Sequence, residues 1–236
     1  MKRFWDNATI TQLANGWSVA LDGKPVRIPG GTALALPTEP LAKAVAAEWQ
    51  DAGGAKGGDF TLNAMPLTRL SGTAQERVAP AQEAIALELA RYGESDLLCY
   101  RTEHPAALAV RQLEGWQPWL DWAADRFGAR LASTTSLMHV PQDPAALAIL
   151  AAAVARHDAY GLGALGVLVP ALGSLVLGLA VSESAITPED AHALSAMDEL
   201  YQEGLWGRDP ESHAGRLRVA ADVASAARFL TLARAA

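Results

Sequence analysis

The chain contains one cysteine, Cys99, among its 236 residues. An intramolecular disulfide is therefore excluded, and a reducing compartment is favoured. The sequence also has no run of lysine or arginine, and its formal net charge is −7. Nucleic acid and anionic membrane surfaces attract a concentrated basic face, so neither is expected as the main partner. The beginning of the chain, Met-Lys-Arg-Phe-Trp-Asp, is followed by no apolar stretch, and we expect neither a secretory signal nor a transit peptide.

Hydrophobic residues are abundant in the chain. Hydrophobic residues make up 50% of the chain and charged residues 19%, which is typical of a folded globular protein. The segment between Asp158 and Glu183 has no charged side chain and is long enough to span a bilayer. However, Pro170 lies near its centre and five glycines weaken any continuous helix. We therefore predict two short buried helices broken near Pro170, with a membrane span as the alternative, and expect no membrane insertion.

The first part of the chain reads as β-rich. Apolar residues alternate over 8–13 and 17–21, and Asp22-Gly23 is a strong signal for a short hairpin turn. A third short strand is expected over 26–28. Thr38 is placed to cap a helix that runs to Trp49.

The pattern after residue 70 is helical. Thr73 begins a capping-box sequence, and Asp143-Pro144 and Thr187-Pro188 each place a capping residue before a proline in the first helical turn. Gly128 is expected to end a helix at Phe127. The sequence thus predicts an α+β fold, in which a small antiparallel β-rich domain over 1–70 precedes a larger α-helical domain over 71–236.

Motifs that carry chemistry are scarce. The glycine-rich stretch 53–58 lacks the Gly-Lys-Ser/Thr ending of a phosphate-binding loop. The five histidines are scattered without the spacing of a metal site. We therefore predict no metal site, no cofactor and no catalytic residue. Three tryptophans, Trp116, Trp119 and Trp122, recur at helical spacing and are interpreted as core, with an aromatic ligand site as the alternative.

The densest group of chemically capable residues is the segment from Tyr92 to Arg101, Tyr-Gly-Glu-Ser-Asp-Leu-Leu-Cys-Tyr-Arg. Gly93 can end one helix in the left-handed conformation, and Ser95 or Asp96 can cap the next. We interpret the segment as a helix corner held by caps and ion pairs, with Cys99 buried among apolar neighbours. The alternative is that the protein is a soluble enzyme or small-molecule-binding protein with its site at this corner.

A second polar group lies in the segment from Met197 to Gly207. On a helix that begins at Thr187, the side chains of Asp198, Gln202 and Trp206 recur at intervals of four along one edge, with Glu199 beside them. Asp198 and Gln202 can hydrogen-bond to each other. The local pattern alone favours a solvated helix face with Trp206 folded inward. A polar edge that carries a tryptophan also suits protein recognition.

Taken together, these pieces resemble the assembly chaperone family of the alpha subunit of the F-type ATP synthase, found in mitochondria and in some bacteria. The segments that carry the resemblance cover nearly the whole chain in the family's order: Asp22-Gly-Lys-Pro-Val-Arg27, Leu36-Pro37, Ala47-Glu-Trp49, Met65-Pro-Leu-Thr-Arg-Leu70, Arg91 to Arg101, Trp122 to Gly128, Gly173 to Leu177, and Asp198-Glu199 through Gln202 to Trp206-Gly207.

The resemblance implies a chaperone without catalysis, nucleotide or metal. Its client would be the unassembled alpha subunit, held soluble until the beta subunit replaces it. We expect the protein to be cytoplasmic in a bacterium, where the mitochondrial matrix is the equivalent place in a eukaryote, and to be monomeric when free. Asp198, Glu199, Gln202 and Trp206, called the α-helical ridge below, are the hypothesised client-binding residues.

Overall fold

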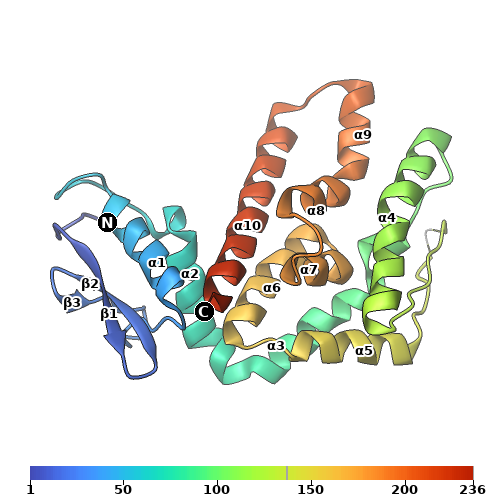
Figure 1. Cartoon of the computed structure of the whole chain (residues 1–236). Coiled ribbons are helices and arrows are strands. Elements are labelled where there is room, and N and C mark those ends of the chain that lie inside the picture. The colour runs from blue at the N-terminus through green and yellow to red at the C-terminus, as the bar shows by residue number, and fades with distance from the viewer. Residues whose placement is uncertain (137, 236) are drawn as a thin grey trace. The chain divides into compact units, whose positions relative to one another are not determined.

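The computed structural model describes residues 1–136 and 138–235. A three-stranded antiparallel sheet near the N-terminus is followed by a chain that is mostly helical (Figure 1), which confirms the predicted α+β class. The chain forms two compact units. Unit 1 comprises Met1–Gln82, Asp158–Ala164 and Ser225–Ala236, and unit 2 comprises Glu83–His157 and Leu165–Ala224. The predicted domain boundary at residue 70 stays a prediction.

The sheet of unit 1 consists of β1 (Ala8–Leu13), β2 (Gly16–Leu21) and β3 (Lys24–Pro25), in the order β1-β2-β3. The predicted turn at Asp22-Gly23 is confirmed, since both residues have a positive φ and Leu21 pairs with Lys24. A positive φ at both central positions defines a type I′ turn, whose twist matches that of the strands. The third strand was predicted over 26–28, and the structure instead places it before Val26.

Two helices of unit 1 follow the sheet. Helix α1 (Glu39–Asp51) is capped by Thr38 as predicted, because the Thr38 side chain accepts a hydrogen bond from the N–H of Leu41. Helix α2 (Pro66–Thr73) continues directly into a π-helical turn over Ala74–Val78. The prediction of a helix start at Thr73 was therefore wrong.

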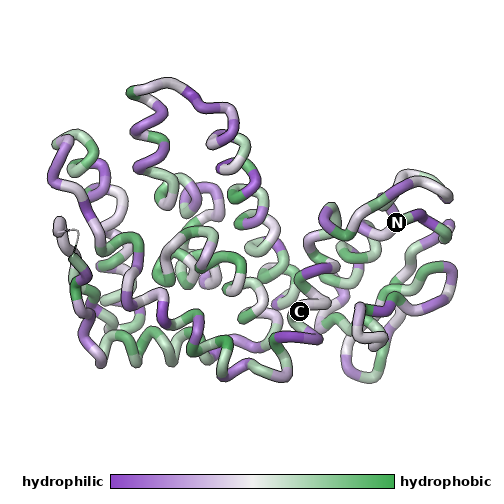
Figure 2. Tube along the Cα trace, turned by 180° about the vertical axis from the view of Figure 1, so that it is seen from behind, coloured by the Kyte–Doolittle hydropathy of each residue, from purple (hydrophilic) through white to green (hydrophobic). Residues whose placement is uncertain are grey.

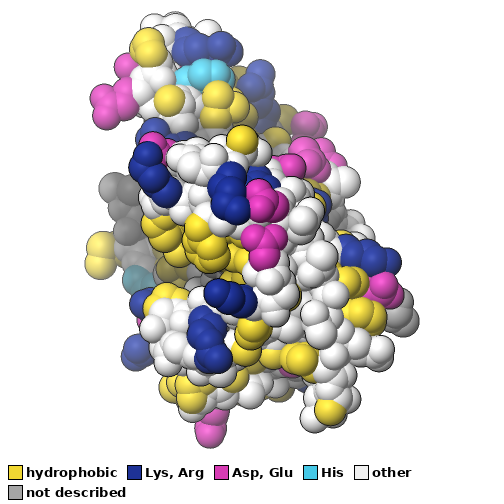
Figure 3. Space-filling view, turned by 90° about the vertical axis from the view of Figure 1, so that its left-hand side faces the viewer, with side chains coloured by type: hydrophobic (Ala, Val, Ile, Leu, Met, Phe, Trp, Pro, Cys, Tyr) yellow, Lys and Arg dark blue, Asp and Glu magenta, His cyan; other side chains and the backbone are white. Residues whose placement is uncertain are grey.

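Contacts with the loop after the sheet replace the predicted capping box at Thr73. The Glu76 carboxylate accepts a hydrogen bond from the N–H of Gly30. The Gln75 side chain accepts one from the N–H of Ala35 and donates one to the carbonyl of Ala33. The surface on the strand side of the molecule mixes hydrophobic, basic and acidic side chains (Figure 3).

The remaining helices form unit 2 or connect it with unit 1. They are α3 (Gln82–Ala90), α4 (Ala106–Phe127), α5 (Pro144–Ala155), α6 (Ala159–Leu172), α7 (Leu175–Ser182), α8 (Pro188–Ser195), α9 (Met197–Trp206) and α10 (Pro210–Arg234). The predicted stop of α4 at Gly128 is confirmed, since Gly128 adopts the left-handed conformation.

The uncharged segment folds as the two short helices α6 and α7, in which glycines and Pro170 interrupt a mostly apolar sequence. Figure 2 colours the chain by hydropathy, and along its helices hydrophobic residues alternate with less hydrophobic ones. All eight residues of α7 are buried. The break lies at Gly173 and Ser174, shortly after the predicted position, and the Ser174 hydroxyl accepts from the N–H of Leu177 to cap α7. None of the described helices combines the length and hydropathy needed to cross a membrane.

Candidate functional site

The segment from Tyr92 to Arg101 lies in unit 2 as two short 3₁₀ turns, Arg91–Ser95 and Leu97–Cys99. Gly93 was predicted to end a helix in the left-handed conformation, but it lies inside the first of these turns without a positive φ. A Cβ at this glycine would lie 3.3 Å from a methyl group of Leu147 and 3.4 Å from one of Leu175. Gly93 therefore serves close packing, which a glycine signal in the sequence cannot distinguish from a cap.

Asp96 is the buried centre of this corner. Its carboxylate accepts hydrogen bonds from the N–H of Leu98 at 3.1 Å and from the N–H of Val176, at the start of α7, at 3.0 Å. Burial raises the pKa of the Asp96 carboxyl above its ordinary value, and these hydrogen bonds oppose that rise. The prediction of a capping role for Asp96 is confirmed. The predicted ion pairs were wrong for Asp96, since backbone N–H groups rather than an arginine satisfy it.

Cys99 is buried as predicted. Burial raises the pKa of its thiol to about 12, so the reactive thiolate is scarce at neutral pH. Arg101 donates to the side chain of Gln117 at 2.8 Å and to the carbonyl of Leu98 at 3.4 Å. Asp96 and Arg101 are therefore held in structural contacts, and the Cys99 thiol is not an activated nucleophile.

The α-helical ridge lies on α9. A single helix was predicted from Thr187 onward, and Thr187 does cap a helix start, but the chain breaks at Ala196 between α8 and α9. Helix α9 ends at Gly207, which has a positive φ. The break separates α9 from α8, and Leu205 near the end of α9 is 60% exposed.

Asp198 is held against α4. Its carboxylate accepts a hydrogen bond of 2.8 Å from the side-chain amide of Gln112, which is almost fully buried. The amide oxygen of Gln112 in turn accepts from the N–H of Thr102 at 2.7 Å. The structure therefore pairs Asp198 with Gln112 rather than with Gln202, the partner that the spacing suggested.

Glu199 points to the other side, toward α10. Its carboxylate lies 3.5 Å from a guanidinium nitrogen of Arg216, and the same guanidinium hydrogen-bonds to Glu203. Glu203 also pairs with Arg208 at 3.1 Å. The Arg216 side chain is only 10% exposed, whereas that of Glu199 is 62% exposed. Arg216 thus offsets the repulsion between two glutamates one turn apart, and it leaves the Glu199 side chain mostly exposed.

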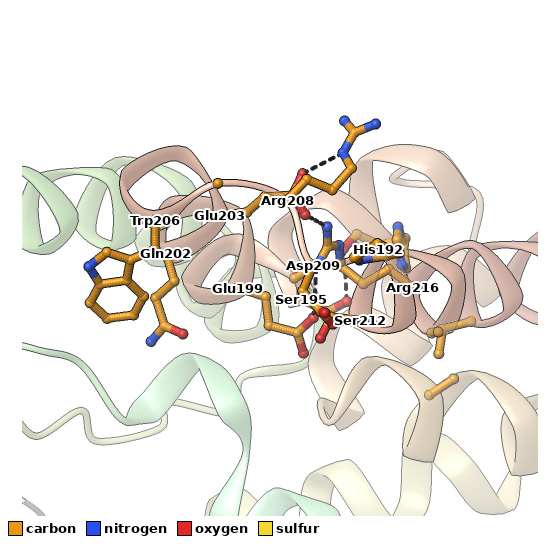
Figure 4. Close-up of a pocket in the computed structure, with 16 residues that line it drawn as sticks. His192, Ser195, Glu199, Gln202, Glu203, Trp206, Arg208, Asp209, Ser212 and Arg216 are labelled. Atoms are coloured by element: carbon orange, nitrogen blue, oxygen red, sulfur yellow. Dashed lines mark hydrogen bonds and ion pairs between the residues drawn. The ribbon is translucent and has the colours of Figure 1, made fainter.

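Trp206 is the most exposed large hydrophobic side chain among the described residues, at 79%. The interpretation that it folds inward was wrong. A cavity of about 780 Å³ lies between α8, α9 and the start of α10, and Glu199, Gln202 and Trp206 all line it. Figure 4 shows Gln202 and Trp206 beside each other, away from the cluster around Arg216.

The cavity also has a fixed wall. Asp209 caps α10 by accepting a hydrogen bond of 2.7 Å from the N–H of Ser212. This bond is the main cause that lowers the pKa of the Asp209 carboxyl below its ordinary value. His192 and Ser195 of α8 also line the cavity and lie near Asp209 (Figure 4). The arrangement is suited to binding another molecule through an aromatic surface, an amide and a carboxylate.

Three of the four ridge residues therefore line one cavity, while Asp198 turns toward α4. Sequence reasoning missed Gln112 and Arg216, which hold the two acids of the ridge in place. Gln112 is separated from Asp198 by 86 residues, so no local spacing could have indicated the pair. Among the described residues, no group of three or more histidine, cysteine, aspartate or glutamate side chains is placed to hold a metal ion.

The three tryptophans of α4 differ in how deeply they are buried. Trp116 is buried, as predicted, and its indole N–H donates to the carbonyl of Leu194 at 3.0 Å. Trp119 and Trp122 are half-buried and contact each other edge to face. The core interpretation is therefore confirmed only for Trp116.

Comparison with known proteins gives a consistent result. A family described as ATP12 chaperone protein matches residues 2–124. The mitochondrial protein atp12 of Schizosaccharomyces pombe is 24% identical over 224 residues, which span 90% of this chain and 76% of that protein.

Solved structures match along the whole chain. Atp12 from Paracoccus denitrificans is 46% identical, with a TM-score of 0.93 over 99% of this chain and 98% of that one. The Atu1473 protein from Agrobacterium tumefaciens is 33% identical, with a TM-score of 0.89 over 98% of this chain and 85% of that one.

Proposed function

The chain belongs to the family of ATP12 chaperone proteins, and we propose that it binds the unassembled alpha subunit of the F-type ATP synthase without using ATP. In this proposal it keeps the alpha subunit soluble until the beta subunit takes its place. The family match and the similarity along the whole chain support the chaperone role. The client is named through the sequence resemblance described above. The proposed place of action is the bacterial cytoplasm, with the protein monomeric when free.

The physical problem that such a chaperone solves is the exposed surface of an unassembled subunit. A subunit that belongs in a ring displays apolar patches meant for its neighbours, and large exposed apolar patches lead to aggregation. The chaperone must cover such a patch and still release it. A dissociation constant of about 1 μM corresponds to about −8 kcal/mol, and the larger interface of a permanent complex can displace binding of that strength.

We place client capture on the α-helical ridge, and the observation that carries this is the exposure of Trp206. Tryptophan is among the residues that contribute most to protein interfaces when buried by a partner. A tryptophan left 79% exposed next to a cavity has a large apolar surface to offer. Gln202 lies beside it and provides both a donor and an acceptor.

The two acids of the ridge have different roles in this proposal. Glu199 can accept hydrogen bonds from the client as well as pair with Arg216, because its side chain is 62% exposed. Asp198 is occupied by Gln112 and fixes the orientation of α9 against α4. A variant at Asp198 therefore tests both folding and binding, whereas variants at Glu199 and Trp206 test binding more selectively.

The test of the function is co-expression with the cognate alpha subunit and no other subunit of the enzyme. We expect the alpha subunit to be found in the soluble fraction and to co-purify with this chain. The matched control is the alpha subunit expressed alone, which should aggregate. If the alpha subunit is equally insoluble with and without this chain, the proposed function is wrong.

The test of the site uses Glu199→Lys in the same experiment. The variant reverses the charge of a side chain that is 62% exposed, and Arg216 keeps Glu203 as its partner, so we expect it to fold and to capture less alpha subunit. Glu88→Lys, which makes the same charge change at an exposed position of α3, is the control. Normal capture by a well-folded Glu199→Lys variant would show that the ridge is not the site, while the chaperone role itself would stand.

A further inference from the structure

A second groove of unit 2 lies between α4 and the region around α8, with a volume of about 600 Å³. Trp119, Ile186, Leu194 and Met197 contribute apolar surface to it. It contains none of the four ridge residues, and it is separate from the cavity beside Trp206.

The groove depends on a glycine of α4. A Cβ at Gly115 would lie 2.6 Å from the terminal methyl of Met197 and 3.0 Å from a methyl of Leu194. A side chain at this position would have to displace the ends of the Met197 and Leu194 side chains from their places beside α4. Met197 and Trp119 are each only partly buried, so the groove has an apolar lining that a partner could cover. Methionine adapts its shape to different apolar partners.

The charged side chains at this groove are all acidic, and the hydroxyl of Thr187, which also lines it, donates to the Asp190 carboxylate at 2.7 Å. Glu114 and Asp190 are exposed acids that line it, and none of its described lining residues is basic. Pro118 lies inside α4 and has no N–H, so the backbone carbonyl of Glu114 lacks its usual helical donor. Two carboxylates and a carbonyl thus lie next to an apolar lining.

We infer that this groove binds a polypeptide segment in which an apolar side chain lies next to lysine or arginine. The apolar side chain would cover Met197 and Trp119. The basic side chain would donate to the Glu114 and Asp190 carboxylates. The charge of the groove selects against acidic segments, because like charges disfavour association. This inference does not depend on the proposed function, since it concerns a different surface and its test uses no alpha subunit.

The experiment follows the methionine methyl groups by NMR, after labelling them with ¹³C. The chain has four methionines, and only Met197 lines the groove. The probe is the peptide acetyl-Ser-Lys-Leu-Lys-Ser-amide, added to the full chain. The matched peptides replace both lysines with glutamate, or the leucine with serine. We expect the Met197 resonance to shift saturably with the first peptide and much less with the other two.

Two variants locate the binding. Glu114→Lys should weaken peptide binding by about five-fold or more, which is the scale of one surface charge pair. Ala193→Phe, at an exposed position of α8 that lines the groove, should fill it and abolish the shift. Glu88→Lys, outside the groove, should bind the peptide as the parent chain does.

Several results would overturn the inference. One is a Met197 resonance that does not move with the basic peptide. Another is equal binding of the acidic peptide, or equal binding by Glu114→Lys and Glu88→Lys. A Met197 shift that depends on protein concentration without peptide would identify a second copy of the chain as the occupant, and would also overturn it.

Discussion

The corner at Tyr92–Arg101 and the α-helical ridge on α9 are both rich in polar and aromatic side chains, yet the structure uses them in opposite ways. At the corner, Asp96 and Cys99 are completely buried, and backbone N–H groups satisfy the carboxylate. On the ridge, the side chains of Trp206 and Glu199 are mostly exposed. A segment dense in polar side chains therefore indicates a binding site only where those side chains are not already buried and hydrogen-bonded within the protein.

The two regions differ because their polar side chains find hydrogen-bond and ion-pair partners in different parts of the fold. Asp96 bonds one N–H two residues away and another 80 residues away, at the start of α7. The corner therefore joins two parts of unit 2. On the ridge, Gln112 and Arg216 hold the two acids, but Trp206 and Gln202 remain at the cavity. The following predictions separate the stabilising role of the corner from the binding role of the ridge.

The largest effect is expected from Asp96→Ala. The change leaves the N–H groups of Leu98 and Val176 buried without their acceptor, and each such loss costs roughly 1–3 kcal/mol. We expect the free energy of unfolding to fall by about 3 kcal/mol in urea denaturation. Asp125→Ala, at an exposed position of α4, is the control and should change it little. An unchanged stability for Asp96→Ala would show that the corner does not stabilise unit 2.

The next effect is expected from Trp206→Ala, which removes the exposed indole. We expect the affinity for the alpha subunit to fall by about 2 kcal/mol, as for a central interface residue, with thermal stability unchanged. The measurement is the amount of alpha subunit that co-purifies, alongside the melting temperature. Leu200→Ala, at another partly exposed position of α9, is the control and should capture normally. Equal capture by both variants would remove Trp206 from the site.

A smaller effect is expected from Gln112→Leu, which keeps the side-chain size but removes both hydrogen bonds. The N–H of Thr102 and the carboxylate of Asp198 lose their partner, and we expect a loss of about 1.5 kcal/mol in the free energy of unfolding. Because α9 is then less firmly held, capture of the alpha subunit should also decrease. If stability falls and capture per folded molecule does not, the Asp198 contact serves folding alone.

The smallest effect at neutral pH concerns Cys99, whose contribution to stability changes only in alkaline solution. Burial raises the pKa of its thiol from 9.0 to about 12 in the folded chain. The folded state therefore favours the protonated thiol, so this contribution to stability is present below about pH 9 and is lost as pH rises toward 12. Cys99→Ala should lose stability less steeply than the parent chain between these values. The measurement is urea denaturation at a series of pH values, and parallel curves for the two chains would contradict the prediction.

Much of the fold could be predicted from local signals. Asp22-Gly23, Thr38, Gly128 and Ser174 each act through their own few neighbours, so the hairpin, two helix ends and the cap of α7 are visible in the sequence. The failures have a common cause. Gly93 packs against Leu147, and the side chains after Thr73 bond the loop around Gly30, so distant contacts override the local pattern.

The same limit applies to the site. The spacing of Asp198, Gln202 and Trp206 correctly placed them along one helix, because that depends only on helical period. It could not show that Asp198 bonds Gln112 or that Trp206 faces outward. Both depend on where α4 and α10 lie in unit 2, and α10 reaches α9 only after the turn at Gly207.

The most direct test of the central claim is a photo-crosslinking comparison of the two regions. Trp206 or Tyr92 is replaced in turn by photoreactive benzoylphenylalanine, and each chain is co-expressed with the alpha subunit and irradiated. The ridge hypothesis predicts a covalent adduct with the alpha subunit from position 206 and none from position 92. An adduct from position 92 alone, with capture intact and no adduct from position 206, would contradict it.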